Sequence, residues 1–140
     1  MNGGFRLTSK RLISKNKAPG APDWTDLMLA QRRFAEARDW QPFHTPKNLA
    51  MALSVEAAEL VECFQWLTPE QSAGLGARKR RAVEQEMADV LLYLLRLADV
   101  LEVDLPLAAR RKMALNARKY PVRLSRGTAQ RRRSQRGSRV

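Results

Sequence analysis

Apolar residues recur every three or four positions along most of this chain of 140 residues, the spacing that is typical of amphipathic α-helices. This pattern and its flanking Asp, Thr and Pro residues predict four helices, over about 24–39, 46–67, 78–103 and 104–119. A short turn after Thr68-Pro69 and a flexible connection link the second helix to the third. Because no alternating β-branched run occurs, we expect an all-α fold in which four helices form an antiparallel bundle.

Within each helix, one stripe of residues is predicted to face the core. In the first helix the stripe contains Leu27, Ala30, Phe34 and Ala37. In the second helix it contains Leu49, Ala52, Leu53, Glu56, Leu60, Cys63, Phe64 and Leu67, with Glu59 at its edge. In the third helix it contains Val83, Met87, Val90, Leu94, Leu97 and Leu101, with Glu86 inside it and Asp89 and Tyr93 beside it. Acidic residues therefore border the predicted core.

The third helix is apolar almost all round from Val90 to Leu101, interrupted mainly by Arg96 and Asp99. A helix of this kind is buried on more than one side. In so small a protein we expect a second subunit to cover it, which predicts a homo-oligomer. The alternative is an unusually central helix in a monomer.

The net charge of +12 comes entirely from the two ends of the chain. Residues 1–22 contain five basic residues and residues 122–140 contain seven, and neither range contains an acidic residue. The body between them has 14 basic and 14 acidic residues. Because the ends are rich in Gly, Ser, Lys and Arg, we expect disordered tails at 1–22 and 122–140 around one domain at 23–121.

Other features of the whole chain bear on partners and location. The basic tails can contact nucleic acid or another polyanion non-specifically, and the alternative is a solvated tail without a dedicated partner. No run of eighteen or more apolar residues is present, so no membrane span is expected. The single cysteine, Cys63, cannot form an internal disulfide, which is consistent with a reducing compartment, and we expect a cytoplasmic protein.

Two pairs of carboxylates lie at core-like positions, Glu56 with Glu59 and Glu86 with Asp89. Residues three apart share one face of a helix, so two neighbouring antiparallel helices can bring the four carboxylates together. Carboxylates are rarely buried without compensation. The pairs therefore predict either a bound cation or a set of buried salt bridges.

The ligand types available decide which cation is expected. Ligation by oxygen alone suits Mg²⁺, with Mn²⁺ as a substitute. The sole histidine, His44, is expected in a loop away from either pair, which argues against a zinc site or a di-iron site. In the salt-bridge alternative, the candidate partners are Lys47, Arg96 and Lys112.

Polar and aromatic residues elsewhere favour a nucleotide as the ligand. On the fourth predicted helix, Lys112, Asn116 and Lys119 share one face that could hold phosphate oxygens. Flat surfaces near the ends of the acidic helices come from Trp40, Trp66 and Tyr93. Ordinary core packing explains each aromatic residue alone. Together with the carboxylates, these groups suggest a nucleoside polyphosphate.

These residues resemble the all-α MazG-like nucleotide pyrophosphohydrolases, and most closely their dCTP pyrophosphatase branch. The resemblance covers about 24–121 and excludes both tails. Its motifs, in order, are Arg38-Asp39-Trp40 with Phe43-His44, Glu56-x-x-Glu59-x-x-Glu62 with Phe64-Gln65-Trp66, Glu86-x-x-Asp89 with Tyr93, Val103-Asp104-Leu105-Pro106-Leu107, and Lys112-x-x-x-Asn116-x-x-Lys119-Tyr120-Pro121. So many matches in order are highly specific.

The resemblance implies Mg²⁺-dependent hydrolysis of a nucleoside triphosphate, dCTP or a modified dCTP, to the monophosphate and pyrophosphate, in sanitation of the nucleotide pool. It also implies a helical homo-oligomer, a dimer or tetramer. The metal ligands that it implies are Glu56, Glu59, Glu86 and Asp89. The substrate-binding residues that it implies are Trp40, Trp66, Tyr93, Lys112 and Asn116.

Three further positions refine what the resemblance implies. Glu62 completes the family's third acidic position, and its outward angle suggests that it supports the ligands or orients a water. Gln31 replaces a histidine that close dCTP-preferring relatives place there, and Ala114 replaces an aspartate. Both replacements bear on nucleotide preference and leave the metal chemistry intact.

Two other classes of function stay open at this point. The first is a helical module that binds nucleic acid or another polyanion through its basic tails; deleting both tails would abolish that binding. The second is a helical adaptor with merely solvated acids, whose thermal stability Mg²⁺ would not change.

Overall fold

The structure, a computed structural model, describes residues 23–127, and its regular elements in this range are all helices. They are α2 (Trp24–Glu36), α3 (Pro46–Glu62), α4 (Pro69–Ala73), α5 (Ala77–Val100), α6 (Leu105–Lys119) and α7 (Val122–Ser125). The predicted all-α class is confirmed for the described residues. The chain divides into two units, one ending at Glu102 and one beginning at Val103, and each is described by itself.

Side chains just before the helices define where they begin. Asp23 accepts hydrogen bonds from the backbone N–H groups of Thr25 and Asp26, and Asp26 accepts one from Asp23 in return, which forms a capping box. Thr45 accepts the N–H of Asn48 at the start of α3, ahead of proline at the first helical position. The predicted starts of these helices are therefore confirmed.

The helices end earlier than the sequence pattern predicts. Instead of continuing to Leu67, α3 ends at Glu62, and the chain continues as tight turns in which Leu67 N–H bonds the carbonyl of Phe64. Likewise α5 ends at Val100 rather than Val103. Phe64 and Leu67, in the turn after α3, are half-buried, so periodicity alone extended the prediction beyond the last helical hydrogen bond.

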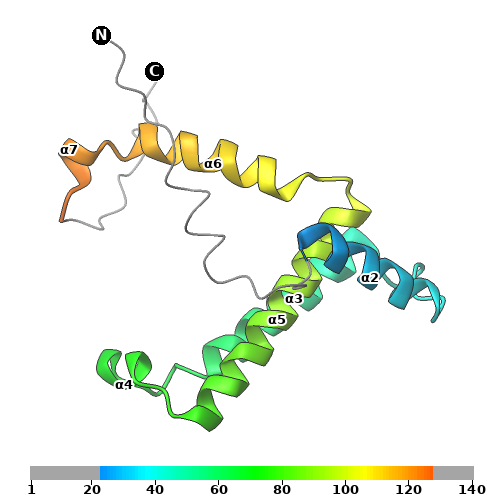
Figure 1. Cartoon of the computed structure of the whole chain (residues 1–140), viewed down its shortest axis with the longest axis horizontal. Helices are drawn as coiled ribbons and strands as arrows, with labels where there is room; N and C mark the ends of the chain where they lie inside the picture. The colour runs from blue at the N-terminus through cyan, green and yellow to red at the C-terminus, as the bar shows by residue number, and fades with distance from the viewer. Residues whose placement is uncertain (1–22, 128–140) are drawn as a thin grey trace, which may run out of the picture. The chain divides into compact units, whose positions relative to one another are not determined.

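In the first unit, α3 and α5 lie side by side and antiparallel, and α2 packs against α5 (Figure 1). The stripe predicted for the second helix is confirmed, because its first residue, Leu49, is buried and its other members are all at least half-buried. The buried apolar side chains of the described residues are Ala35, Leu49, Val83, Leu95 and Ala98. This small core holds the two acidic helices next to each other.

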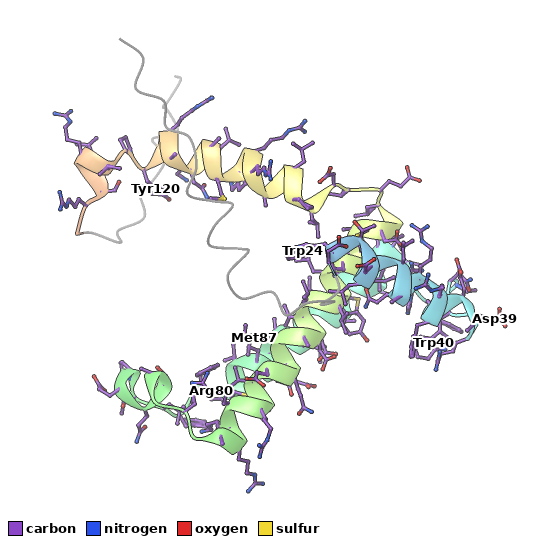
Figure 2. The ribbon with its side chains drawn as sticks, in the orientation of Figure 1. Trp24, Asp39, Trp40, Arg80, Met87 and Tyr120 are labelled. Carbon is purple, nitrogen blue, oxygen red and sulfur yellow. The ribbon has the colours of Figure 1, made fainter. Side chains whose placement is uncertain are left out.

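The stripe predicted for α5 is partly wrong. Met87, at 57% exposure, stands out from the helix (Figure 2), and Leu94 and Leu101 are exposed too, whereas Leu95 and Ala98 are buried. From Val90 to Leu101 this helix is apolar on nearly every side, so periodicity could not select the buried face there; contacts with α2 and α3 do so.

The stripe predicted for the first helix is also partly wrong. Ala30 and Phe34 are exposed, whereas Gln31 is half-buried and Ala35 is fully buried. The inward face of α2 is therefore turned by about one residue from the predicted one, which places a polar amide, Gln31, toward the rest of the unit.

In the second unit, α6 begins after the N-cap Asp104, whose carboxylate accepts the N–H of Leu107. After Pro121 the chain forms the short helix α7, which lies inside the range predicted as a C-terminal tail. Residues 1–22 and 128–140, where most of the predicted disorder falls, lie outside the described residues. Within the described range, no helix has the length and apolar character that a membrane span requires.

Candidate active site

Carboxylates from α3 and α5 meet at the contact between these helices. One carboxylate oxygen from each of Glu56, Glu86 and Asp89 lies within 4.8 Å of the others. Glu56 and Glu86 are half-buried and Asp89 is exposed. Three residues that the sequence singled out from two distant segments are therefore brought together by the antiparallel pairing of the two helices.

The electrostatics of this cluster are those of crowded negative charges. Burial, and then the charges of Glu59 and Asp89, raise the pKa of Glu86 above its ordinary value. Burial, and then the charges of Glu59, Asp89 and Glu86, raise the pKa of Glu56. Burial and the surrounding negative charges thus make Glu56 and Glu86 harder to ionise, and a nearby cation would reverse the effect.

No basic side chain neutralises the cluster among residues 23–127. The two ion pairs found there both use Asp99, one with Arg32 and one with Arg96. The buried Oε2 atom of Glu86 has no hydrogen-bond partner in the described part of the chain. An oxygen-only donor set with an unpartnered buried oxygen fits a hard cation such as Mg²⁺, and the salt-bridge alternative receives no support from these contacts.

The remaining acidic residues of α3 lie around this cluster. Glu59 is exposed and lies outside the set of three close carboxylates, although its charge acts on both Glu56 and Glu86. Glu62 is exposed, and its charge also contributes to the raised pKa of Glu86. Both residues are thus near enough to influence the candidate ligands.

Trp40 is positioned by the turn that ends α2. The backbone N–H of Trp40 donates a hydrogen bond to the carbonyl of Ala35, and the N–H of Asp39 donates one to the carbonyl of Glu36. These two bonds form the pattern of a Schellman motif. Asp39 has a φ of 52°, a left-handed conformation that Asp tolerates better than most residues (Figure 2). The Trp40 ring then contacts Phe34 edge to face, with 5.7 Å between centroids.

A cavity of about 210 Å³ lies between α2, α5 and the loop that contains Trp40. Its lining residues are Gln31, Phe34, Trp40, His44, Asp89, Leu92, Tyr93 and Arg96. Asp89 belongs to both the cavity and the acidic cluster, so the aromatic surfaces and the candidate ligands adjoin. The buried Oε1 atom of Gln31 has no hydrogen-bond partner among the described residues.

Three of the predicted substrate-binding residues are not among those that line this cavity. Trp66 lies in the turn after α3 with 86% of its surface exposed. Lys112 and Asn116 are exposed residues of α6, one turn apart, in the second unit. Their roles stay predictions.

Sequence reasoning missed a polar network at the C-terminal end of α5. Arg96 was a candidate partner for the acidic pairs, but its guanidinium pairs with Asp99 and donates a hydrogen bond to His44. His44 was expected away from the acidic pairs, yet it lines the same cavity as Asp89. The available signal was the spacing of Arg96 and Asp99, three residues apart on an otherwise apolar helix.

Known proteins similar to this chain were identified at the levels of family, sequence and structure. The model of the MazG-like family matches residues 51–132. The protein named dCTP pyrophosphatase 1 from Bos taurus is 42% identical over 132 residues, which cover 92% of this chain and 78% of the bovine protein. The protein of the same name from Homo sapiens is 44% identical over 110 residues, covering 77% of this chain and 65% of the human protein.

Among solved structures, that of a pyrophosphatase from Archaeoglobus fulgidus is similar, with a TM-score of 0.66 and 43% sequence identity. The match covers 75% of this chain and 99% of the archaeal one. The similarity therefore extends over nearly the whole of that smaller protein.

The repulsion within the cluster gives a test of stability. We expect Glu86→Gln to raise the melting temperature of the protein in EDTA, because the neutral amide relieves repulsion from Glu56 and Asp89. Excess Mg²⁺ should raise the melting temperature of the wild type more than that of the variant. Glu84→Gln, an exposed change on the same helix, serves as the matched control.

The pH dependence of this difference follows from the raised pKa of Glu86. Because its folded-state pKa lies above the unfolded value, Glu86 destabilises the fold only at pH values where it is ionised. The advantage of Glu86→Gln in EDTA should therefore shrink as the pH falls through the raised pKa. A variant less stable than the wild type at neutral pH would indicate that Glu86 is held by a favourable partner instead.

Proposed function

The chain belongs to the MazG-like family, and we propose that it hydrolyses a nucleoside triphosphate to the monophosphate and pyrophosphate. The observation that carries this proposal is the carboxylate cluster of Glu56, Glu86 and Asp89 beside an aromatic-lined cavity. The resemblance drawn from the sequence motifs is confirmed by the family match and by relatives named dCTP pyrophosphatase 1. Those names support pyrophosphohydrolysis as the reaction class.

The acidic cluster would hold Mg²⁺, or Mn²⁺ in its place. Glu56, Glu86 and Asp89 would supply carboxylate oxygens, and Glu59 would join them after a change of rotamer, which its exposed position allows. When bound, the cation would neutralise charge on the triphosphate and increase the acidity of water near the phosphorus to be attacked. Glu62, at the outer edge of α3, would orient that water or support the ligands.

The aromatic cavity would receive the base and sugar. Trp40 and Tyr93 line it and offer apolar ring surface against which a nucleobase can stack. The roles proposed for Trp66, Lys112 and Asn116 rest on the sequence motifs: an aromatic surface for the nucleotide, a charge that would neutralise phosphate oxygens and an amide that would donate hydrogen bonds. Because Asp89 lines the cavity, a base held there has its phosphates near the cluster.

We propose that the preferred nucleotide is dCTP or a modified dCTP. Gln31 lines the cavity and offers an amide oxygen without a hydrogen-bond partner in the described chain, which suits a donor such as the exocyclic amine of cytosine. The resemblance drawn from the sequence implies that close dCTP-preferring relatives have histidine at this position, so Gln31 would bear on the preference. Ala114, the second departure, lies on the exposed surface of α6.

The reaction is tested by measuring pyrophosphate release from each of the four dNTPs and from dCTP with a modified base. We expect Mg²⁺-dependent release with a monophosphate as the other product, because the carboxylate cluster would hold the cation beside the triphosphate. We expect the release to be highest for dCTP or a modified dCTP, because Gln31 would accept a hydrogen bond from the exocyclic amine of cytosine. EDTA should abolish the release. The absence of release from every nucleotide would contradict the proposal.

Self-association would cover apolar surface that one chain leaves exposed. Met51, Val55 and Val61 on α3 and Met87 and Leu94 on α5 are exposed large apolar side chains. Exposed apolar surface on this scale is typical of interfaces. A dimer or tetramer would bury it, as the apolar character of the third helix predicts.

The oligomer is tested by light scattering coupled to gel filtration. We expect a mass two or four times that of one chain, reduced by Met87→Glu, because burying the new charge at the interface is costly. A wild type with the mass of one chain at micromolar concentration would contradict self-association.

A further inference from the structure

Building on the proposed function, we propose that Arg96 is a positioning residue which, through His44, fixes the Trp40 side of the substrate cavity against α5. Arg96 lies on α5, is only 8% exposed and lines the cavity. It belongs to the same helix as Glu86 and Asp89, so a link from it to the loop would set the distance between the aromatic surface and the acidic cluster.

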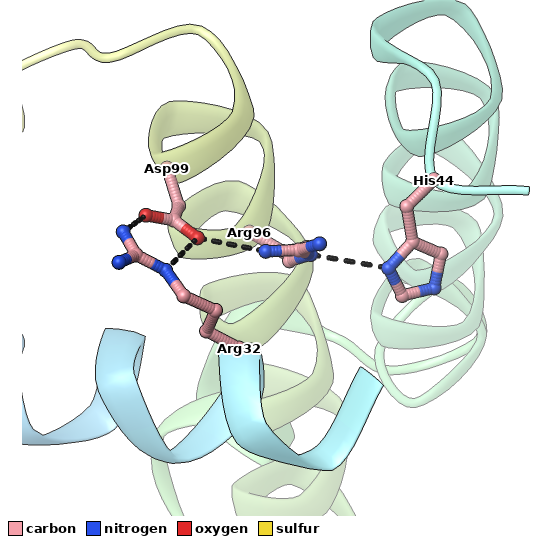
Figure 3. A network of polar contacts seen from close by, with 4 residues as sticks. All are labelled: Arg32, His44, Arg96 and Asp99. Carbon is pink, nitrogen blue, oxygen red and sulfur yellow. Dashed lines mark hydrogen bonds and ion pairs between the residues drawn. The ribbon is translucent and has the colours of Figure 1, made fainter. Parts of the chain in front are cut away.

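Hydrogen bonds from Arg96 join separate segments of the chain (Figure 3). Its Nε donates to Nδ1 of His44 over 3.1 Å, and its Nη1 donates to Oδ2 of Asp99 over 2.7 Å. Asp99 also accepts from the guanidinium of Arg32 on α2, with 3.2 Å between Nε and Oδ2. The planar guanidinium can hold both partners at once, which an ammonium group on a flexible stem does less well.

The negative charge of Asp99 stabilises the buried guanidinium of Arg96 in the position from which it donates to His44. A buried guanidinium needs an anionic partner, and Asp99 provides it. Hydrogen bonding to Arg32 is the largest cause that lowers the pKa of Asp99, so its carboxylate stays ionised at neutral pH. His44 accepts at Nδ1, which places the proton of its neutral ring on Nε2. Burial and the charge of Arg96 lower the pKa of His44 and so favour that neutral ring.

His44 transmits the constraint to Trp40. The two rings meet edge to face with 5.8 Å between centroids, and the backbone N–H of His44 bonds the carbonyl of Trp40 over 3.1 Å. The loop is fixed at its start by the turn at Asp39 and at its end by the N-cap Thr45. Just before Thr45, the loop contacts α5 through the hydrogen bond from Arg96 to His44, so losing that bond would free Trp40 to move relative to Asp89.

Two substitutions at His44 separate the hydrogen bond from the ring. His44→Phe keeps an aromatic ring against Trp40 and removes the acceptor, whereas His44→Asn keeps an acceptor oxygen near the position of Nδ1 and removes the ring. We expect His44→Phe to raise the KM for the best dNTP substrate about tenfold, the order of a hydrogen bond to a charged group, with kcat changed less than about threefold. His44→Asn keeps the hydrogen bond and loses only the ring contact, so we expect it to raise KM less than His44→Phe does.

A second measurement needs no turnover. In a background of Trp24→Phe and Trp66→Phe, Trp40 is the sole tryptophan, and its quenching by acrylamide reports its mobility and exposure. We expect His44→Phe to increase the quenching of Trp40, and His44→Asn, which keeps the hydrogen bond, to increase it less. Circular dichroism confirms that each variant is folded before the comparison.

The outcomes distinguish the positioning role from the proposed reaction. Increased quenching in His44→Phe that is smaller in His44→Asn supports the positioning role even if no nucleotide is hydrolysed, and then only the proposed function fails. Unchanged quenching together with an unchanged KM in a folded His44→Phe variant overturns the positioning role. A fall in melting temperature without either change assigns the network to stability alone and also overturns it.

Discussion

Mutual repulsion among the carboxylates between α3 and α5 is the constraint on which the rest of this structure depends. Glu56, Glu86 and Asp89 lie within 4.8 Å of one another, and burial and neighbouring charges raise the pKa values of the two glutamates. In the absence of a cation this arrangement costs stability, which apolar contacts such as those of Leu49 and Leu95 must offset. A helix pair that tolerates such a cost is suited to binding a metal ion, because the ion removes the repulsion.

Within the described part of the chain, charged side chains are unpaired in one half of α5 and paired in the other. Near Glu86 and Asp89 the negative charges have no basic partner among residues 23–127, whereas near its end Arg96 and Asp99 compensate each other and are joined by Arg32. The unpaired carboxylates are available to bind a cation, whereas the ion pair between Asp99 and Arg32 holds α2 against α5. The cavity between α2, α5 and the Trp40 loop is lined by Asp89 from the first group and Arg96 from the second. The same helix would therefore position both the metal site and the base site.

Much of the local structure was predictable because local signals determine it. Side-chain caps and proline positions gave the helix starts, and the stripe predicted for α3 is buried or half-buried, although Met51, Val55 and Val61 elsewhere on this helix are exposed apolar residues. The exposed position of Leu94 was not predictable, since α5 is apolar nearly all round from Val90 to Leu101 and tertiary contacts select its face. The pairing of Arg96 with His44 joins residues 52 apart in the chain, which no local pattern encodes.

The central claim is that the carboxylate cluster holds the divalent cation used in hydrolysis of a nucleoside triphosphate. The most direct measurement is the rate of pyrophosphate release by Glu56→Gln over a range of Mg²⁺ concentrations, beside the wild type and the exposed control Glu84→Gln. Loss of one ligand should lower kcat/KM by about 100-fold or more and shift half-saturation to higher Mg²⁺, with the control unchanged. A folded Glu56→Gln variant with wild-type turnover and wild-type Mg²⁺ dependence would contradict the account.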